Sequence, residues 1–289
     1  MNIISVTDIT KTYTERKLFE KASFYLQERE KVGVIGINGT GKSTLLKIAA
    51  GIEEPDEGQV IRANHIVVRY LPQNPVFDPE LSVIDTVLAQ SSQNFVGGTS
   101  EQNQNAGNHA EHVEHWNLES DAKAMMTKLG ITDFEQKAGE LSGGQRKRLA
   151  LVAALLVPCD VLILDEPTNH LDSAMADWLE DYLKKFKGAL LMITHDRYFL
   201  DRVVRRIFAF EGDGNVVQYE GGFTDYQVAY QRKLAQSGGG EMSGVSGNRA
   251  GSQNVSGNQG GNGGAGSASG ADGAGMESGA SVKSSQDGR

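Results

Sequence analysis

With 289 residues, a net charge of −9 at pH 7 and one cysteine, the chain has room for one large or two small domains and no disulfide framework. The acidic balance argues against a broad nucleic-acid surface and gives no reason to predict DNA binding. Basic clusters at 146–148, 184–187 and 202–206 could contact RNA, although such runs are more often solvated helix faces. Without a secretory leader or an apolar run of about 18 residues, we expect a soluble, cytoplasmic protein with no membrane span.

Composition changes sharply after Gln236. From Gly238 to Arg289 the sequence contains no Leu, Ile, Phe, Tyr or Trp and is rich in Gly, Ser and Asn. Such a segment buries too little apolar surface to offset the entropy lost on ordering. We therefore predict one α/β domain with a subdomain over residues 1–236, followed by a disordered tail over residues 237–289.

The first elements predict a small antiparallel sheet. Residues 3–6 and 22–26 alternate apolar and polar side chains, as half-buried strands do. Tyr13 lies between them, 23 residues before Gly36. An aromatic ring there could stack on a nucleotide base, although an isolated tyrosine in a hairpin is more often ordinary packing.

Residues 36–44, the phosphate loop, match the pattern G-x-x-x-x-G-K-[ST] at every fixed position. A buried strand is expected before the loop at 31–35 and a helix after it. The glycines allow backbone N–H groups to approach a triphosphate closely, Lys42 adds a charge for its outer phosphates, and the Ser43 hydroxyl is suited to Mg²⁺. The loop residues expected to bind nucleotide are Gly36, Asn38, Gly39, Gly41, Lys42, Ser43 and Thr44.

Strands are expected at 59–63 and 66–70, and helices at 82–90 and 120–129. Between the helices, residues 91–117 are polar and of low complexity, which indicates an insertion. Its histidines fall at intervals of three and would share one side of a helix, which suggests a metal site, but no second ligand cluster accompanies them. These histidines are His109, His112 and His115.

Two apolar runs, 161–164 and 189–193, have the character of buried parallel strands. The first ends in Asp165 and Glu166, and the second is followed by a segment containing His195. Because ligands bind at the carboxyl ends of such strands, we expect these polar groups at one edge of the sheet. Upstream, residues 141–145 lead into a long helix, expected at 148–156, and offer a second helix N-terminus suited to an anion.

Taken together, these pieces resemble an ATP-binding cassette (ABC) ATPase over residues 2 to about 236. The resemblance implies an ABC-type P-loop nucleotide-binding domain of the α/β class, with a small antiparallel β subdomain and a helical subdomain at about 74–157. The segments that carry it are the phosphate loop, Leu71-Pro72-Gln73, Leu141-Ser142-Gly143-Gly144-Gln145, Leu162-Ile163-Leu164-Asp165-Glu166 and Thr194-His195-Asp196.

Segments 143–148, 166–172 and 195–201 resemble the ABC-F branch, whose members act on ribosomes or in translation quality control. The insertion lies where that branch carries its arm. The long basic linker between two cassettes that is usual in the branch is not found. Because the chain begins like a first cassette while residues 208–214 and 219–226 look like the close of a second, we hypothesise an internally deleted tandem protein.

The resemblance also implies roles for single residues. Lys42 holds the β and γ phosphates of ATP, Ser43 and Asp165 order Mg²⁺, and Gln73 senses the metal and the attacking water. Glu166 acts as general base, and His195 contacts the γ-phosphate.

By the same resemblance, residues Ser142, Gly143, Gly144 and Gln145 face the γ-phosphate on another cassette. The chain is therefore expected to pair with itself or with another ABC cassette, and its remaining partner is expected to be the ribosome or RNA. Two alternatives remain open: the motor subunit of a membrane transporter, and a binding module that holds ATP with little turnover.

Overall fold

The computed structural model describes residues 1–13, 16–93, 115–211 and 214–237. The expected helix at 120–129 begins earlier, and the predicted tail, His109 and His112 lie outside these residues. The elements are β1 (Asn2–Tyr13), β2 (Arg16–Gln27), β3 (Lys31–Ile35), α1 (Lys42–Ala50), β4 (Glu57–Arg62), β5 (Val68–Leu71), α2 (Val83–Gln93), α4 (His115–Lys128), the 3₁₀ turn η1 (Ala138–Glu140), α5 (Gly143–Leu156), β6 (Val161–Asp165), α6 (Ser173–Lys185), β7 (Ala189–Ile193), α7 (Arg197–Val203), β8 (Arg206–Glu211), β9 (Asn215–Glu220) and α8 (Phe223–Ser237).

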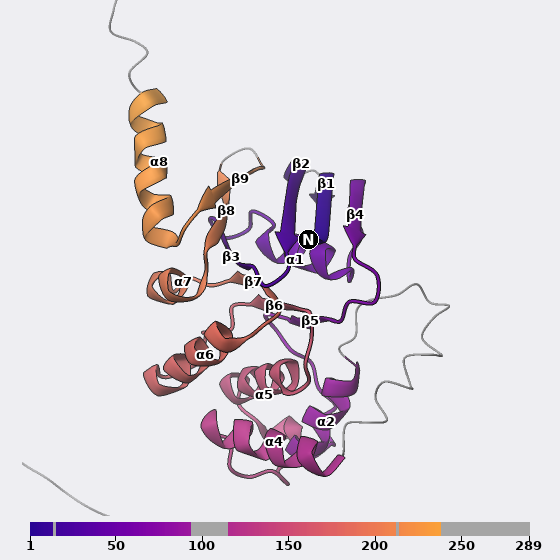
Figure 1. The fold of residues 1–289 in the computed structure, drawn as a ribbon. Helices are drawn as coiled ribbons and strands as arrows, with labels where there is room; N and C mark the ends of the chain where they lie inside the picture. Colours follow the sequence, from indigo (N-terminus) through magenta and orange to yellow (C-terminus); the bar gives the residue numbers. More distant parts are fainter. Residues whose placement is uncertain (14–15, 94–114, 212–213, 238–289) are drawn as a thin grey trace, which may run out of the picture. The chain divides into compact units, whose positions relative to one another are not determined.

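A six-stranded sheet in the order β5-β6-β7-β3-β8-β9 forms the centre of the fold (Figure 1). Its first five strands run parallel, and β9 pairs antiparallel with β8. All five residues of β6 and all five of β7 are buried, as expected for apolar strands covered on both faces. The parallel arrangement brings the carboxyl ends of β3, β6 and β7 to one edge.

The small antiparallel sheet has the order β2-β1-β4. Its inner face shares one hydrophobic core with α1 and with one face of the large sheet. Within this core the ring centroids of Phe24 and Phe208 lie 4.9 Å apart. The strands extend well beyond the short segments predicted from sequence, because the pairing of β1 with β2 continues to Tyr13 and Arg16 across several register shifts.

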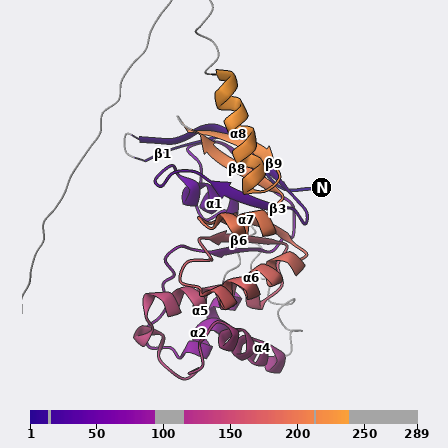
Figure 2. The same ribbon diagram turned by 90° about the vertical axis from the view of Figure 1, so that its left-hand side faces the viewer.

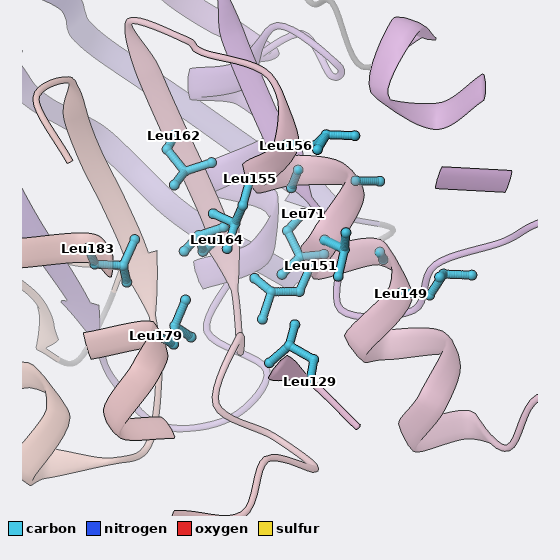
Figure 3. Packing of buried hydrophobic residues seen from close by; sticks show 14 of the residues in the cluster. Leu71, Leu129, Leu149, Leu151, Leu155, Leu156, Leu162, Leu164, Leu179 and Leu183 are labelled. Carbon is cyan, nitrogen blue, oxygen red and sulfur yellow. The ribbon is translucent and has the colours of Figure 1, made fainter. Parts of the chain in front are cut away.

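Helices α2, α4 and α5 pack against one another, and both views show them together at the end of the molecule opposite α8 (Figures 1 and 2). Their buried apolar side chains join those of the sheet in a second core, and Figure 3 shows its leucines from α5, β5, β6 and α6. The helix α5 begins five residues earlier than predicted, because Ser142 and Gln145 form a reciprocal capping box at its start. No helix in the described parts of the chain has the length and apolar character needed to cross a bilayer.

Truncating a central core residue should destabilise the whole domain. Leu190 of β7 is fully buried, so Leu190→Ala should lower the free energy of unfolding by about 2–5 kcal/mol through lost burial and a residual cavity. Urea titration followed by circular dichroism measures this change. The control is Ile61→Ala, at a side chain that is 57% exposed on β4, with an expected change of about 0.5 kcal/mol. Equal losses in both variants would contradict the assigned core.

Candidate functional site

The phosphate loop connects β3 to α1, and two of its glycines are required by their surroundings. Gly41 adopts φ 97° at the N-terminus of α1, and a Cβ there would lie 2.9 Å from Cβ of Leu18. Gly36 adopts φ 153°, and a Cβ there would lie 2.7 Å from Cβ of Phe210. Both positions therefore exclude side chains through backbone conformation and through lack of space.

The side chain of Lys42 is buried within the phosphate loop. Its ammonium donates hydrogen bonds to the carbonyl oxygens of Gly36 at 2.8 Å and Ile37 at 2.9 Å. Burial lowers the pKa of Lys42, and the negative charges of Glu166 and Asp165 oppose this shift. The ammonium therefore lies within electrostatic reach of both carboxylates. Asn38 lies at the exposed tip of the same loop.

Asp165 and Glu166, the acidic pair, lie at the end of β6 with exposed fractions of only 1% and 4%. Burial raises the pKa of both carboxyls, and a hydrogen bond with the Ser43 hydroxyl opposes the shift at Asp165. One oxygen of each, Oδ1 of Asp165 and Oε2 of Glu166, is buried without a hydrogen-bond partner. Unpartnered buried carboxylate oxygens are costly, and oxygen donors beside a hydroxyl are the ligands that Mg²⁺ prefers.

His195 completes this cluster from the neighbouring strand. Its Nε2 lies 3.1 Å from Oε1 of Glu166, and the imidazole remains 60% exposed. The Oγ1 atoms of Thr168 and Thr194 lie 2.6 Å apart, which joins the segment after β6 to the end of β7. The backbone N–H of Glu166 donates to the carbonyl oxygen of Ile193 at 2.9 Å. This hydrogen bond holds Glu166 in its left-handed conformation, with φ 54°.

Lys147, a residue that the sequence analysis did not single out, connects α5 to two of the predicted segments. Its ammonium donates to the carbonyl oxygens of Gln73 at 2.8 Å, Asp165 at 3.0 Å and Pro72 at 3.4 Å. The sequence feature that could have identified Lys147 is its position on α5, four residues before the buried Leu151, on the apolar face of the helix. Its neighbour Arg148 donates to the carbonyl of His170, so this basic cluster faces partly inward.

Tyr13 lies near the first turn of α1 but does not line the cavity beside the phosphate loop. Its hydroxyl donates to a carboxylate oxygen of Glu53, which raises the pKa of the phenol, and it lies close to the Thr44 side chain. The ring is 46% exposed, and the ammonium of Lys11 lies 5.8 Å from its centre. Stacking of a base on Tyr13 stays a prediction.

A cavity of about 930 Å³ opens beside the phosphate loop. One wall contains Gly36, Lys42 and His195, and the other contains four aromatic residues. These are Phe210 of β8 and Phe223, Tyr226 and Tyr230 of α8. The cavity therefore gives solvent and ligands access to the charged end of the loop.

The signature segment, residues 141–145, lies elsewhere. Ser142 caps α5, with its Oγ donating to Oε1 of Gln145 at 2.8 Å and accepting from the Gln145 backbone at 3.3 Å. Gly143 lines a different recess of about 370 Å³ together with Gln73, and this recess shares no lining residue with the cavity beside the phosphate loop. Gly144 packs against His170, where an added Cβ would lie 3.3 Å from the histidine Cβ.

The predicted site residues thus fall into two groups. The structure brings Lys42, Ser43, Asp165, Glu166 and His195 together and joins the backbone of Gln73 to this group through Lys147. It places Ser142 to Gln145 outside the cavity. Among the residues that the structure describes, no cluster of three or more His, Cys, Asp or Glu side chains is arranged to hold a metal ion.

The raised pKa of Asp165 predicts that Asp165→Asn stabilises the nucleotide-free protein at neutral pH. Burial disfavours the ionised carboxyl, so its contribution to stability is complete below its ordinary pKa of 3.8 and is lost as pH rises through the higher pKa of the folded state. The neutral amide avoids this loss. We expect a higher urea midpoint than wild type at pH 7, with the difference shrinking toward pH 4. Exposed Asp181→Asn is the control, and a lower midpoint for Asp165→Asn at pH 7 would contradict the interpretation.

Comparison with known proteins agrees with this geometry. Residues 19–169, more than half of the chain, match the ABC transporter family model. YfmR of Bacillus subtilis (strain 168), described as an uncharacterized ABC transporter ATP-binding protein, is 37% identical over 81% of this chain and 39% of its own length. The energy-dependent translational throttle protein EttA of Escherichia coli (strain K12) is 35% identical over 77% of this chain and 43% of its own.

Among solved structures, the dimeric post-hydrolysis state of the ATP-binding cassette MJ0796, bound to ADP and Pi, superposes with a TM-score of 0.61 at 24% identity. The match covers 75% of this chain and 98% of that chain, so the likeness extends over a whole cassette. Against the two curated relatives, by contrast, the chain spans less than half of their length. With its phosphate loop, acidic pair and signature segment on this fold, the chain belongs to the ABC transporter family of ATP-binding cassettes, which are ATPases.

Proposed function

We propose that this chain binds ATP with Mg²⁺ and hydrolyses it as an ABC-F-type cassette that works on the ribosome after dimerising. The observation that carries the hydrolytic part is the buried acidic pair, with one unpartnered oxygen on each carboxylate, next to Lys42 and Ser43 and with Glu166 Oε1 3.1 Å from Nε2 of His195. An arrangement that places cationic and acidic groups at one edge of the sheet suits phosphoryl transfer, which depends mainly on positioning and charge stabilisation.

Each residue has a distinct task in this mechanism. Lys42 and the loop N–H groups hold the β and γ phosphates, while Ser43, Asp165 and Gln73 are the residues that would hold Mg²⁺. When bound, the metal supplies positive charge to the phosphates as they react. Glu166 accepts the proton of the attacking water. His195, whose Nε2 lies 3.1 Å from Oε1 of Glu166, keeps this carboxylate oriented and presents its exposed ring to the γ-phosphate.

Dimerisation is proposed because the signature segment lies apart from the phosphate loop. Ser142 and Gly143 are exposed at the start of α5 and line no part of the cavity beside Lys42. Helix N-termini bind anions, so an exposed one is suited to the γ-phosphate of a second cassette. The dimeric state named for the MJ0796 cassette supports this arrangement.

The proposed site of action rests on the curated relatives. EttA is named a translational throttle protein, whereas the alternative, a transporter motor, is supported by the name of the family model, by the description of YfmR and by the shared cassette fold. Ribosome co-sedimentation with and without ATP tests this choice. Sedimentation that requires ATP supports the ribosomal role, and co-purification with a membrane protein in place of ribosomes would overturn it.

Glu166→Gln should slow ATP hydrolysis by about 10²–10⁴-fold, because the amide cannot accept a proton from the attacking water. ATP should then hold the dimer together, giving a species of twice the monomer mass in size-exclusion chromatography with light scattering. The control is Glu119→Gln, an exposed position on α4. Unchanged turnover in Glu166→Gln would exclude this residue as the base.

Lys42→Ala should weaken Mg·ATP binding by about 10–100-fold, the usual loss for hydrogen bonds to a charged group. Isothermal titration calorimetry measures the dissociation constant directly. Lys128→Ala, in the last turn of α4, should bind like the wild type. An unaltered dissociation constant in Lys42→Ala would place the nucleotide elsewhere.

Specific activity of the wild-type chain should rise with its concentration, because a productive site needs two cassettes. Turnover measured over a range that spans the dimer dissociation constant tests this expectation. Activity that is proportional to enzyme concentration over the whole range would contradict a dimeric enzyme, and no turnover at any concentration would identify a binding module.

A further inference from the structure

We propose that Lys147 is a positioning residue that fixes the end of β6 and the Gln73 turn, residues 72–75, against the signature helix α5. Through it, the placement of the acidic pair depends on the position of the helix that presents Ser142. The kinetic part of this inference rests on the proposed function, whereas its structural part does not.

The contacts of Lys147 carry the proposal. Its side chain starts from α5, is only 4% exposed and ends among three carbonyl oxygens from two other segments. Two of these, on Pro72 and Gln73, belong to the turn after β5, and the third belongs to Asp165 at the end of β6. One ammonium thus donates to acceptors in the Gln73 turn and at the end of β6, using all three of its donors.

Burying a lysine ammonium costs desolvation free energy, so its burial here requires compensating interactions. An ammonium taken out of water is tolerated only where hydrogen bonds and opposite charge replace its hydration. Here three carbonyls and the nearby carboxylates of Asp165 and Glu166 do so. A purely apolar residue would fill the space at a lower desolvation cost but would leave the three carbonyls without this donor.

The same helix also contacts the segment on the other side of the acidic pair. The guanidinium of Arg148 donates to the carbonyl of His170 at 3.3 Å, and Gly144 packs against the His170 side chain. Because α5 is held to Asp165 by one residue and to His170 by another, a displacement of its N-terminus is transmitted to both ends of the segment that contains Glu166. A partner docking at Ser142 would therefore act on the acidic pair.

Hydrogen–deuterium exchange on the full nucleotide-free chain tests the structural part. Lys147→Met keeps the length and apolar stem of the side chain and removes its donors. We expect amide exchange at residues 71–75 and 165–171 to become about tenfold faster, the loss expected for hydrogen bonds to a charged group, with rates in β1 and β2 unchanged. Lys123→Met, at an exposed ion pair on α4, is the matched control.

Two results would overturn the structural part. Rates at both segments within twofold of wild type would show that Lys147 does not hold them. Faster exchange throughout the chain, including β1 and β2, would show a lysine that only stabilises the fold. Lys147→Gln, which retains two donors on a shorter side chain, should give intermediate rates at these segments.

Kinetics test the functional part. The three hydrogen bonds of Lys147 go to Pro72, Gln73 and Asp165 and not to the phosphate loop. The dissociation constant of ATP should therefore change by less than about threefold while kcat falls about 10–100-fold, as expected when catalytic groups are slightly misplaced. A kcat within twofold of wild type, or equal losses in kcat and affinity, would overturn it. If the wild type itself has no turnover, the proposed function fails, and the exchange measurements still decide the role of Lys147.

Discussion

The structure depends on keeping two carboxylates buried at the carboxyl end of β6. Asp165 and Glu166 follow four fully apolar residues and are almost inaccessible to solvent, yet each retains an oxygen without a hydrogen-bond partner. Such burial is unfavourable by itself, and the Ser43 hydroxyl together with the ammonium groups of Lys147 and Lys42 favours the ionised carboxylates. The unpartnered oxygens of Asp165 and Glu166 have lone pairs free to bind a cation, which makes this edge of the sheet suited to a cation bound with a phosphate chain.

The rest of the fold serves to bring these charges together. Parallel pairing of β6 with β7 and of β7 with β3 puts the acidic pair, His195 and the phosphate loop at one edge, although more than a hundred residues separate the loop from the other two in sequence. The two hydrophobic cores on either face of the sheet hold this edge rigid. Rigidity matters because a preorganised charged site loses little energy to rearrangement when the reacting groups arrive.

Helix α5 has two functions at once. Its capped N-terminus presents the signature segment to solvent, and its buried side inserts Lys147 between the Gln73 turn and β6. A single rigid element thus joins the surface proposed for a second cassette to the interior of the site. Within one chain the signature segment lies apart from the cavity beside the phosphate loop, so α5 is the element that connects this exposed segment to the acidic pair.

Local spacing and strongly apolar strands were enough to predict the phosphate loop, the family and the fold class. The end of parallel strands at a common edge also predicted that Glu166 and His195 would meet. The start of α5, set by the capping of Ser142, and the place of Tyr13 beside Glu53 instead of in the cavity became visible in the fold alone. Lys147 shows the reason: its spacing from Leu151 indicates the apolar face of α5, but only the packing of α5 against the ends of β5 and β6 supplies the carbonyl oxygens that its ammonium contacts.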